Sequence, residues 1–296
     1  MAAEPDRWSR WVLERRDGGS QEQREATLEG LAAIRGRVLR NAEPLEGRTL
    51  LDVGAGDGLI GLGALDRVGP DGRVIFSDVS PALLERCRDA VRLRDALDRA
   101  EFVAAAAEDL AGVPDDSVDV ATTRSVLIYV VDKPAAFASM YRVLRPGGRI
   151  SVFEPINRLM FPEPDGRFFG YDLTSVGELV ARVHAIFTAG ERSVRSAMMD
   201  FDDRDLARLA EEAGFEPVHV ECHIDIERGR DDLAVSLEAL LDGAPNPNAP
   251  TVREAVDAAL TAPEQVQFMT ALAKAFKDRR AVRRSAVAYL SATKSA

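Results

Sequence analysis

The sequence predicts an α/β protein with a mostly parallel sheet, and two patterns lead to this prediction. Between residues 48 and 153, five short apolar segments alternate with stretches of helical periodicity, which is typical of βαβ units. Farther along, apolar and polar residues alternate over 216–226, and a last apolar segment covers 285–292. Both segments are predicted to be strands, so we expect seven strands in a sheet with helices on both faces.

Residues 1–47 are predicted to form an N-terminal helical cap. Trp8, Trp11 and Val12 recur with the spacing of one helix face. A glycine pair then interrupts the pattern, and Ser20 can cap the helix that follows it. The cap is therefore expected to consist of two helices that precede the first strand.

Residues 48–230 are predicted to form the core of the fold. Its first five strands are expected at residues 48–53, 73–77, 100–104, 118–123 and 148–153, with helices between them at 59–68, 81–94 and 133–144. After the fifth strand, residues 155–171 are irregular and aromatic, which suits a pocket wall, a lid or a buried spacer. Further helices are expected at 173–188 and 202–213.

The remaining chain is predicted to contain an insertion and the last strand. Residues 231–281 have a mostly helical pattern, and we expect this helical insertion to serve as a lid or as a dimer contact. Residues 282–296 are predicted to supply the last strand of the core.

Composition and charge exclude several classes of protein. The chain has 296 residues, of which 46% are apolar and 29% are charged, so it can bury a core and is not a disordered chain. Its formal charge of −11 disfavours sequence-independent binding to nucleic acid. Two cysteines form neither a disulfide framework nor a multi-thiolate zinc site, and we expect no metal. Without a signal-peptide pattern or a long apolar stretch, the sequence predicts a cytoplasmic protein that does not enter a membrane.

The most informative segment is LLDVGAGDG at residues 50–58, where a strand leads through glycines into a helix. Glycine allows a sharp turn and the close approach of a ligand. A dinucleotide pyrophosphate favours a site without carboxylates, yet Asp52 precedes the loop and Asp57 lies within it. Because carboxylates attract cations, S-adenosylmethionine, with its ammonium and sulfonium groups and no phosphate, fits better. The alternative for Asp52 is a turn residue bonded to its own backbone.

A further carboxylate supports a nucleoside ligand. Asp78 ends the second strand, 20 residues after Gly58. At this place a carboxylate can accept hydrogen bonds from both hydroxyls of an adenosine ribose. The alternative is a solvated acid that caps the helix beginning near Pro81.

Four segments in this order resemble the motifs of class I S-adenosylmethionine-dependent methyltransferases of the small-molecule type, in particular the ubiquinone and menaquinone biosynthesis-like group. They are LLDVGAGDG, FSDVS, AAAAEDLAGVPDDSVDV and YRVLRPGGRISVFEP. The match is dense over about residues 45–155 and resumes at FDDRDLARLAEEAGFEPVHVE. The resemblance implies a Rossmann-like, seven-stranded mixed sheet whose last strand runs antiparallel, and N-terminal helices that close over the cofactor.

The resemblance also implies roles for nine residues that match cofactor-binding positions. Those expected at the methionine part of S-adenosylmethionine are Asp52, Gly54, Gly56, Arg124 and Ser125. Those expected at the ribose and the adenine are Asp78, Val79, Ala107 and Glu108. Arg124 can pair with the cofactor carboxylate or with an anionic substrate, and the alternative is a surface arginine.

Methyl transfer from a sulfonium is an in-line displacement, so the enzyme mainly has to position the acceptor, an effect worth about 7–11 kcal/mol. A general base is needed only for a protonated acceptor. Glu154, directly after the fifth strand, and His223, on the sixth, are the catalytic candidates. The alternatives are a capping acid for Glu154 and a solvated side chain for His223.

The sequence therefore predicts methyl transfer to oxygen, nitrogen or carbon of a small organic acceptor, of the kind found in secondary metabolism. A peptide acceptor, an NAD(P)-dependent oxidoreductase and a catalytically inactive cofactor-binding homologue are the alternatives. Self-association into a homodimer is compatible with the sequence.

Overall fold

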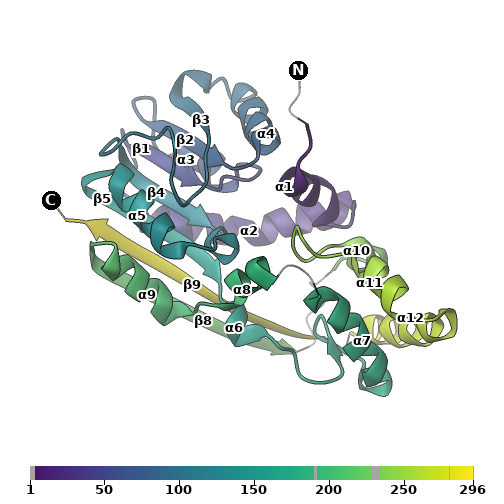
Figure 1. Cartoon of the computed structure of the whole chain (residues 1–296). Coiled ribbons are helices and arrows are strands. Elements are labelled where there is room, and N and C mark those ends of the chain that lie inside the picture. Colours follow the sequence, from purple (N-terminus) through teal and green to yellow (C-terminus); the bar gives the residue numbers. More distant parts are fainter. Residues whose placement is uncertain (1–3, 190–191, 229–233, 280, 296) are drawn as a thin grey trace.

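The computed structural model describes residues 4–189, 192–228, 234–279 and 281–295. Its centre is a seven-stranded sheet with the order β3-β2-β1-β4-β5-β9-β8 (Figure 1). The strands are β1 (Thr49–Val53), β2 (Arg73–Asp78), β3 (Ala100–Ala104), β4 (Val118–Arg124), β5 (Leu144–Pro155), β8 (Phe215–Arg228) and β9 (Val282–Lys294). The predicted α/β class and its seven strands are confirmed.

The last strand has the direction that the resemblance implies. β9 pairs antiparallel with both of its neighbours, β5 and β8, while β1 to β5 pair in parallel. β8 pairs with β9 from Phe215 to Arg228, whereas β5 pairs with β9 only from Arg149 to Pro155. The long ribbon of β8 and β9 therefore continues beyond the rest of the sheet (Figure 1).

Helices cover both faces of the sheet. On one face lie α2 (Gln21–Asn41), α3 (Leu59–Leu65) and α4 (Pro81–Arg92), and on the other α5 (Lys133–Val143) and α9 (Asp203–Glu212). None of the helices in the described ranges combines the length and the apolar character needed to cross a bilayer.

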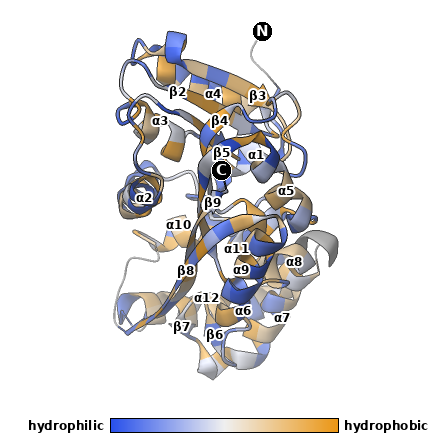
Figure 2. Cartoon of the chain, turned by 90° about the vertical axis from the view of Figure 1, so that its left-hand side faces the viewer, coloured by the Kyte–Doolittle hydropathy of each residue, from blue (hydrophilic) through white to orange (hydrophobic). Residues whose placement is uncertain are grey.

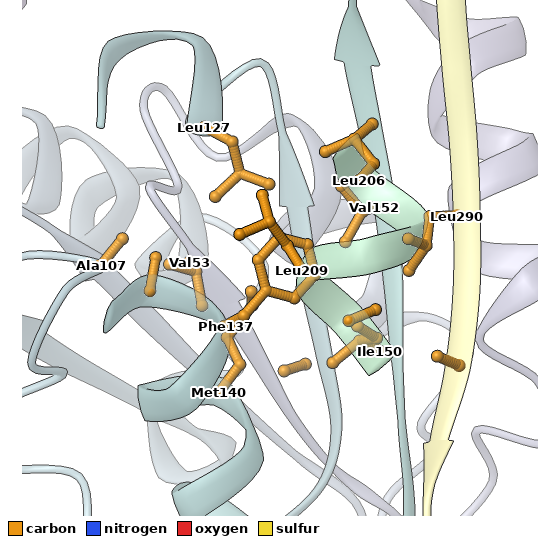
Figure 3. Close-up of a cluster of buried hydrophobic side chains, with 14 of the residues drawn as sticks. Val53, Ala107, Leu127, Phe137, Met140, Ile150, Val152, Leu206, Leu209 and Leu290 are labelled. Atoms are coloured by element: carbon orange, nitrogen blue, oxygen red, sulfur yellow. The ribbon is translucent and has the colours of Figure 1, made fainter. Parts of the chain in front are cut away.

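Figure 3 shows the core on the side of α5 and α9. Phe137 and Met140 of α5 and Leu209 of α9 meet Val152 and Leu290 of the sheet, and all five side chains are buried. Burial of each large apolar side chain contributes about 1.5–3 kcal/mol. The core therefore fixes where the strands end, which is where a ligand binds in folds of this class.

The helix boundaries follow from local signals in the sequence. The Ser20 hydroxyl accepts a hydrogen bond from the Gln23 amide, as predicted for the cap of α2. Ser80 caps α4 in the same way, with Pro81 in the first turn. Gly214, with a φ of +99°, follows the end of α9 and lets the chain turn into β8.

A second hydrophobic core lies outside the sheet. It is built by α7 (Gly177–Thr188), α10 (Leu237–Asp242), α11 (Val252–Ala259), α12 (Ala262–Lys277) and the hairpin of β6 (Arg167–Phe168) and β7 (Tyr171–Asp172), which together we call the helical lobe. In Figure 2 its helices α7 and α12 lie at the opposite end of the molecule from β2 and β3. Phe168, fully buried, packs edge-on against Phe268 at 5.2 Å between ring centroids. The lobe thus has its own core.

The structure differs from the sequence prediction in two places between β5 and α9. The segment 155–171 is not irregular, because it contains α6 (Asn157–Met160) and the hairpin of the helical lobe. Its Phe168 and Tyr171 are buried in the lobe core, which agrees with the spacer alternative for these two residues. Helix α8 (Arg192–Met199) was not expected.

The division between core and insertion also differs from the prediction. The predicted boundary at residues 230–231 lies outside the described residues. In the described part, α7 shares its hydrophobic core with α10, α11 and α12, because its apolar face points into the lobe and not onto the sheet. Residues 173–188 therefore pack with the predicted insertion.

The N-terminal segment passes over the ends of the strands. It contains α1 (Arg7–Arg10) and a π-helical turn (Trp11–Arg15), and α1 lies between α4 and α10 (Figure 1). The Ser80 hydroxyl donates to the Asp6 carboxylate at 2.5 Å, and Trp11 Nε1 donates to the Ala244 carbonyl at 2.8 Å. This segment, residues 6–17, is called the N-terminal strap below.

Candidate cofactor-binding site

The loop between β1 and α3 has the backbone of a close-approach site. Gly54 (φ +66°) and Gly56 (φ +58°) both adopt the left-handed conformation that disfavours side chains. A Cβ atom at Gly54 would lie 2.4 Å from Cγ2 of Val126, so the loop packs tightly against the segment after β4. A Cβ atom at Gly56 would meet nothing within 4 Å, so space is open on this side of the loop.

Asp52 holds the loop to the following helix. Its buried carboxylate accepts hydrogen bonds from the Gly61 amide at 2.8 Å and from the Thr122 hydroxyl at 3.2 Å. Burial raises the pKa of Asp52 to about 7, although both hydrogen bonds act in the opposite direction. Asp52 is thus bonded to α3 and to β4, and not to the backbone of its own turn.

Asp78 joins the ends of two strands. Its Oδ2 accepts a hydrogen bond from the Gly56 amide and its Oδ1 one from the Ser80 amide, both at 2.8 Å. Burial raises the pKa of Asp78. The next residue, Val79, is 52% exposed, so it offers an apolar surface beside the carboxylate. The structure thus brings Asp78, Val79 and Gly56 together.

The loop after β3 contains the two residues expected at the adenine edge. Ala107 is buried, and its carbonyl accepts a hydrogen bond from the Ser139 hydroxyl of α5. Glu108 follows it and is half-buried. Because β3 is the neighbour of β2, this loop and Asp78 lie at the same edge of the sheet.

Arg124 ends β4, beside β1, and Ser125 follows the strand. Burial and the nearby cation of Arg16 lower the pKa of Arg124, while Asp57 and Glu154 act in the opposite direction. Arg124 itself is partly exposed at the end of β4. Ser125 has a φ of +54°, and its amide donates to the Phe153 carbonyl at 2.8 Å.

Glu154 is fully buried at the end of β5, and its carboxylate accepts three backbone hydrogen bonds. The donors are the amides of Val126, Leu127 and Ile128, at 2.9, 3.0 and 3.2 Å. Burial raises the pKa of Glu154 to about 7 against the effect of these hydrogen bonds. Glu154 therefore caps the turn that follows β4, and both of its oxygens are already in use.

The structure does not bring His223 to this site, which corrects its candidacy as a catalytic residue. His223 lies on β8, on the sheet face that α2 covers, where its ring contacts the Arg37 guanidinium at 3.0 Å. Arg37 also pairs with Glu221 at 2.5 Å. Glu154 points to the other face, toward the turn after β4. An alternating pattern identifies one face of a strand, but it does not say where that face lies in the molecule.

Sequence reasoning missed several residues of the N-terminal strap and of the turn after β4. The rings of Trp8 and Trp11 pack edge-on against Tyr129, with centroids 5.1 and 6.3 Å apart. Arg16 lies 3.6 Å from the Asp57 carboxylate of the glycine loop. The sequence indicated helical spacing for the two tryptophans, but no signal identified Tyr129 or Arg16, because both acquire their setting from distant segments.

The residues present fit S-adenosylmethionine. Open space lies beside Gly56 and exposed apolar surface at Val79, and the Asp78 carboxylate lies between them. Two donor atoms of Arg16 are buried and have no hydrogen-bond partner. They can therefore donate hydrogen bonds to a ligand next to the loop. No group of three or more His, Cys, Asp or Glu suited to a metal ion occurs in the described part of the chain.

Comparisons with known proteins identify the family of the chain. Residues 32–225 match the model of the ubiE/COQ5 methyltransferase family. The chain is 34% identical over 178 residues to the ubiquinone/menaquinone biosynthesis C-methyltransferase of Marinomonas sp. (strain MWYL1), with 57% of this chain and 67% of the relative covered. The enzyme of the same name from Vibrio campbellii (strain ATCC BAA-1116) is 36% identical over 173 residues, with 57% and 65% covered. The chain thus spans about two thirds of the length of these relatives.

Solved structures share the fold. The YcgJ protein from Bacillus subtilis has a TM-score of 0.53 at 16% identity, covering 88% of this chain and 98% of that chain. The geranyl diphosphate C-methyltransferase from Streptomyces coelicolor A3(2) has a TM-score of 0.52 at 16% identity, covering 95% and 85%.

The sheet order, the glycine loop and the carboxylate at the end of β2 define a class I S-adenosylmethionine-dependent methyltransferase. Within this class, the chain belongs to the ubiE/COQ5 methyltransferase family. S-adenosylmethionine is therefore its cofactor, and the family assignment favours a methyltransferase over the NAD(P)-dependent oxidoreductase considered from the sequence.

Proposed function

We propose that this methyltransferase transfers the methyl group of S-adenosylmethionine to a carbon atom of a small organic acceptor. The observation that carries the proposal is the meeting of the glycine loop, Asp78 and Arg124 at the carboxyl ends of neighbouring strands. Carbon is the favoured acceptor atom because the curated relatives are named C-methyltransferases. Oxygen and nitrogen acceptors, and a peptide acceptor, are the alternatives that the experiment below separates.

The cofactor is proposed to lie across the ends of β1, β2 and β4. Asp78 would accept hydrogen bonds from the ribose hydroxyls, and Val79 would contact the adenine, with Ala107 and Glu108 at its edge. Gly54 and Gly56 would let the methionine part approach the backbone, with Asp52, Arg124 and Ser125 around it. The cofactor supplies an activated methyl group, and the protein positions the acceptor behind it.

The aromatic cluster of Trp8, Trp11 and Tyr129 is proposed to cover the reacting groups. These rings come from the N-terminal strap and from the turn after β4, and Trp11 is also hydrogen-bonded to Ala244 next to the helical lobe. An apolar cover of this kind excludes water from the methyl donor. It also offers an apolar surface to an organic acceptor.

Glu154 is proposed to act as a positioning residue in place of the general base considered from the sequence. Three backbone amides occupy its two oxygens, so abstraction of an acceptor proton would compete with these hydrogen bonds. By holding residues 126–128, Glu154 fixes the position of Tyr129 and of Val126, which packs against Gly54. His223 is not part of the proposed reaction.

Turnover with labelled cofactor tests the proposal. The purified protein would be incubated with S-adenosylmethionine carrying a ¹³C methyl group and with a panel of phenols, quinols, amines, carboxylic acids and peptides. A C-methyl product, identified by NMR, is the expected result, and an O-methyl or N-methyl product would contradict carbon as the acceptor atom. Tight binding of S-adenosylhomocysteine without any turnover across the panel would favour the inactive homologue.

Ligand-dependent stability provides an independent check of the cofactor. S-adenosylhomocysteine at 100 times its dissociation constant is expected to stabilise the fold by about 2.7 kcal/mol, whereas NADH is expected to have no effect. Stabilisation by NADH alone, measured by thermal unfolding, would contradict the whole assignment.

A homodimer in the cytoplasm is also proposed. β8 is an edge strand of the sheet, and its Ile224 and Ile226 are 58% and 62% exposed. Such an edge is a template for pairing with another chain. Light scattering of the purified protein and of an Ile226→Lys variant is expected to show a dimer and a monomer, and a monomeric natural protein would contradict this. Cell fractionation tests the location.

A further inference from the structure

Arg16 is a partly buried cation, and two of its buried nitrogens have no hydrogen-bond partner. It follows the π-helical turn of the N-terminal strap, and its side chain is 14% exposed. The carboxylate oxygens of Asp17 and Asp57 lie 3.5 and 3.6 Å from its Nε and Nη2, but neither of these two nitrogens forms a hydrogen bond. Buried donors without a partner are costly, so this position favours a ligand that supplies an acceptor.

The charges around Arg16 have both signs. Asp57 belongs to the glycine loop, and Arg124, which ends β4, is close enough for the Arg16 cation to lower its pKa in addition to the effect of burial. The two guanidinium groups and the carboxylates of Asp17 and Asp57 suit a zwitterion, whose carboxylate pairs with the arginines and whose ammonium pairs with an aspartate. The methionine part of S-adenosylmethionine is such a zwitterion.

The N-terminal strap reaches both ends of the proposed cofactor position. At its start, Asp6 is hydrogen-bonded to Ser80, whose amide donates to Asp78. At its end, Arg16 lies beside Asp57 of the glycine loop. A ligand that extends from Asp78 to the glycine loop therefore lies under the strap along its length.

We propose that Arg16 binds the carboxylate of the methionine part of S-adenosylmethionine, and that this contact couples closure of the N-terminal strap to the presence of the complete cofactor. The inference deepens the proposed function and rests on it. An anionic group of the methyl acceptor is the other carboxylate source, and the test separates the two.

Calorimetry with two ligands that differ only in the carboxylate tests the proposal. S-adenosylmethionine and its decarboxylated form would be titrated into the natural protein and into Arg16→Met, Arg16→Lys and Arg10→Met. Arg10 is the matched control, since it lies on the same strap and is exposed. Arg16→Met is expected to weaken binding of S-adenosylmethionine by about 10- to 100-fold and binding of the decarboxylated form by less than about 3-fold. Arg16→Lys should recover part of the loss, and Arg10→Met should bind both ligands as the natural protein does.

A second measurement follows the strap itself. S-adenosylmethionine is expected to protect residues 6–17 of the natural protein from limited proteolysis, and the decarboxylated form to protect them less. In Arg16→Met both ligands should protect equally weakly. The melting temperature of each variant without ligand shows whether it is folded.

Three results would overturn the inference. Equal losses for both ligands in Arg16→Met would indicate a purely structural role. Unchanged cofactor affinity together with a raised KM for the acceptor would assign Arg16 to an acceptor anion. If the natural protein bound neither ligand, the proposed function would fail as well, so this failure is distinct from the other two.

Discussion

At the residue scale, Asp78 is held in place before any ligand binds. Its two oxygens accept hydrogen bonds from the amides of Gly56 and Ser80, which belong to the glycine loop and to the cap of α4. A carboxylate fixed in this way loses little conformational freedom when a ligand binds. Asp78 therefore combines a structural role, joining two loops, with its proposed role at the ribose.

Replacing Asp78 with alanine is expected to weaken binding of S-adenosylhomocysteine by about 1.5–3 kcal/mol, or roughly 10- to 150-fold, because a charge-assisted contact to the ribose is lost. Calorimetry measures the change. Asp66→Ala, at an exposed position after α3, is the matched control and should bind normally. An unchanged affinity of the Asp78 variant would remove this residue from the site.

Glu154 makes the stability of the fold depend on pH. Burial raises its pKa in the folded state to about 7, above the ordinary value of 4.5. Between these two values the folded state binds more protons than the unfolded state, so the contribution of this group to stability falls as the pH rises. The loss of unfolding free energy caused by the buried Glu154 carboxylate is small below pH 4.5 and complete above pH 7.

The variant Glu154→Gln is expected to lack this titration. Relative to the variant, the natural protein should lose about 2–3 kcal/mol of unfolding free energy between pH 5 and pH 8. Urea unfolding of both proteins at both pH values measures the difference, and groups common to the two proteins cancel. A difference that does not change with pH would contradict the raised pKa.

At the scale of elements, one buried lysine attaches α8 to the sheet layer. Lys133, 4% exposed, donates to the Val130 carbonyl at 3.0 Å, to the Ala197 carbonyl at 2.9 Å and to the Asp200 carboxylate at 2.7 Å. All three of its donors are thus used. They tie the end of α8 to the turn after β4 and to the start of α5.

Replacing Lys133 with methionine is expected to lower the free energy of unfolding by about 2–4 kcal/mol, because two buried carbonyls lose their partner. Asp200 is partly exposed, so its share of the loss is small. Urea unfolding measures the change against Lys274→Met, a substitution at an exposed position of α12. A loss below about 0.5 kcal/mol would show that α8 has other anchors of equal strength.

At the scale of the whole molecule, two hydrophobic regions can be weakened separately. Phe168→Ala is expected to destabilise the helical lobe by about 3–5 kcal/mol, because the buried ring leaves a cavity among the lobe helices. Hydrogen exchange should become faster in α7, α11 and α12, with little change in β1 to β4. Equal acceleration in both regions would mean that lobe and sheet unfold as one unit.

The sheet could be predicted from the sequence because each strand is indicated by its own residues and by those directly next to it. β1, β2 and β4 are buried and therefore appear as apolar runs, and turn or capping residues such as Ser20 and Gly214 stand at their usual places. The glycine loop and Asp78 were predictable for the same reason, since they follow directly after strands. Their proposed contacts with the cofactor stay predictions.

The resemblance implied that the N-terminal helices close over the cofactor, but the contacts that hold them in place could not be predicted, because these contacts join distant segments. Trp11 meets Ala244, 233 positions away in sequence, and no local pattern indicates this partner. Arg16 is one of many arginines in the sequence, and only its place at the end of the strap, beside Asp57, buries its Nε and Nη2. For His223 the pattern identified a strand face, but not that α2 covers this face while Glu154 lies on the other face of the sheet.

The position of β9 has a consequence for how the protein is made. This strand comes last among the seven, yet it lies between β5 and β8, which are complete much earlier. A chain emerging from the ribosome can pair its first five strands at once. Until β9 is made, however, β8 has no partner strand in this sheet and one edge of β5 stays unpaired. Only after residues 282–294 have left the ribosome can β9 pair with both strands and complete the sheet.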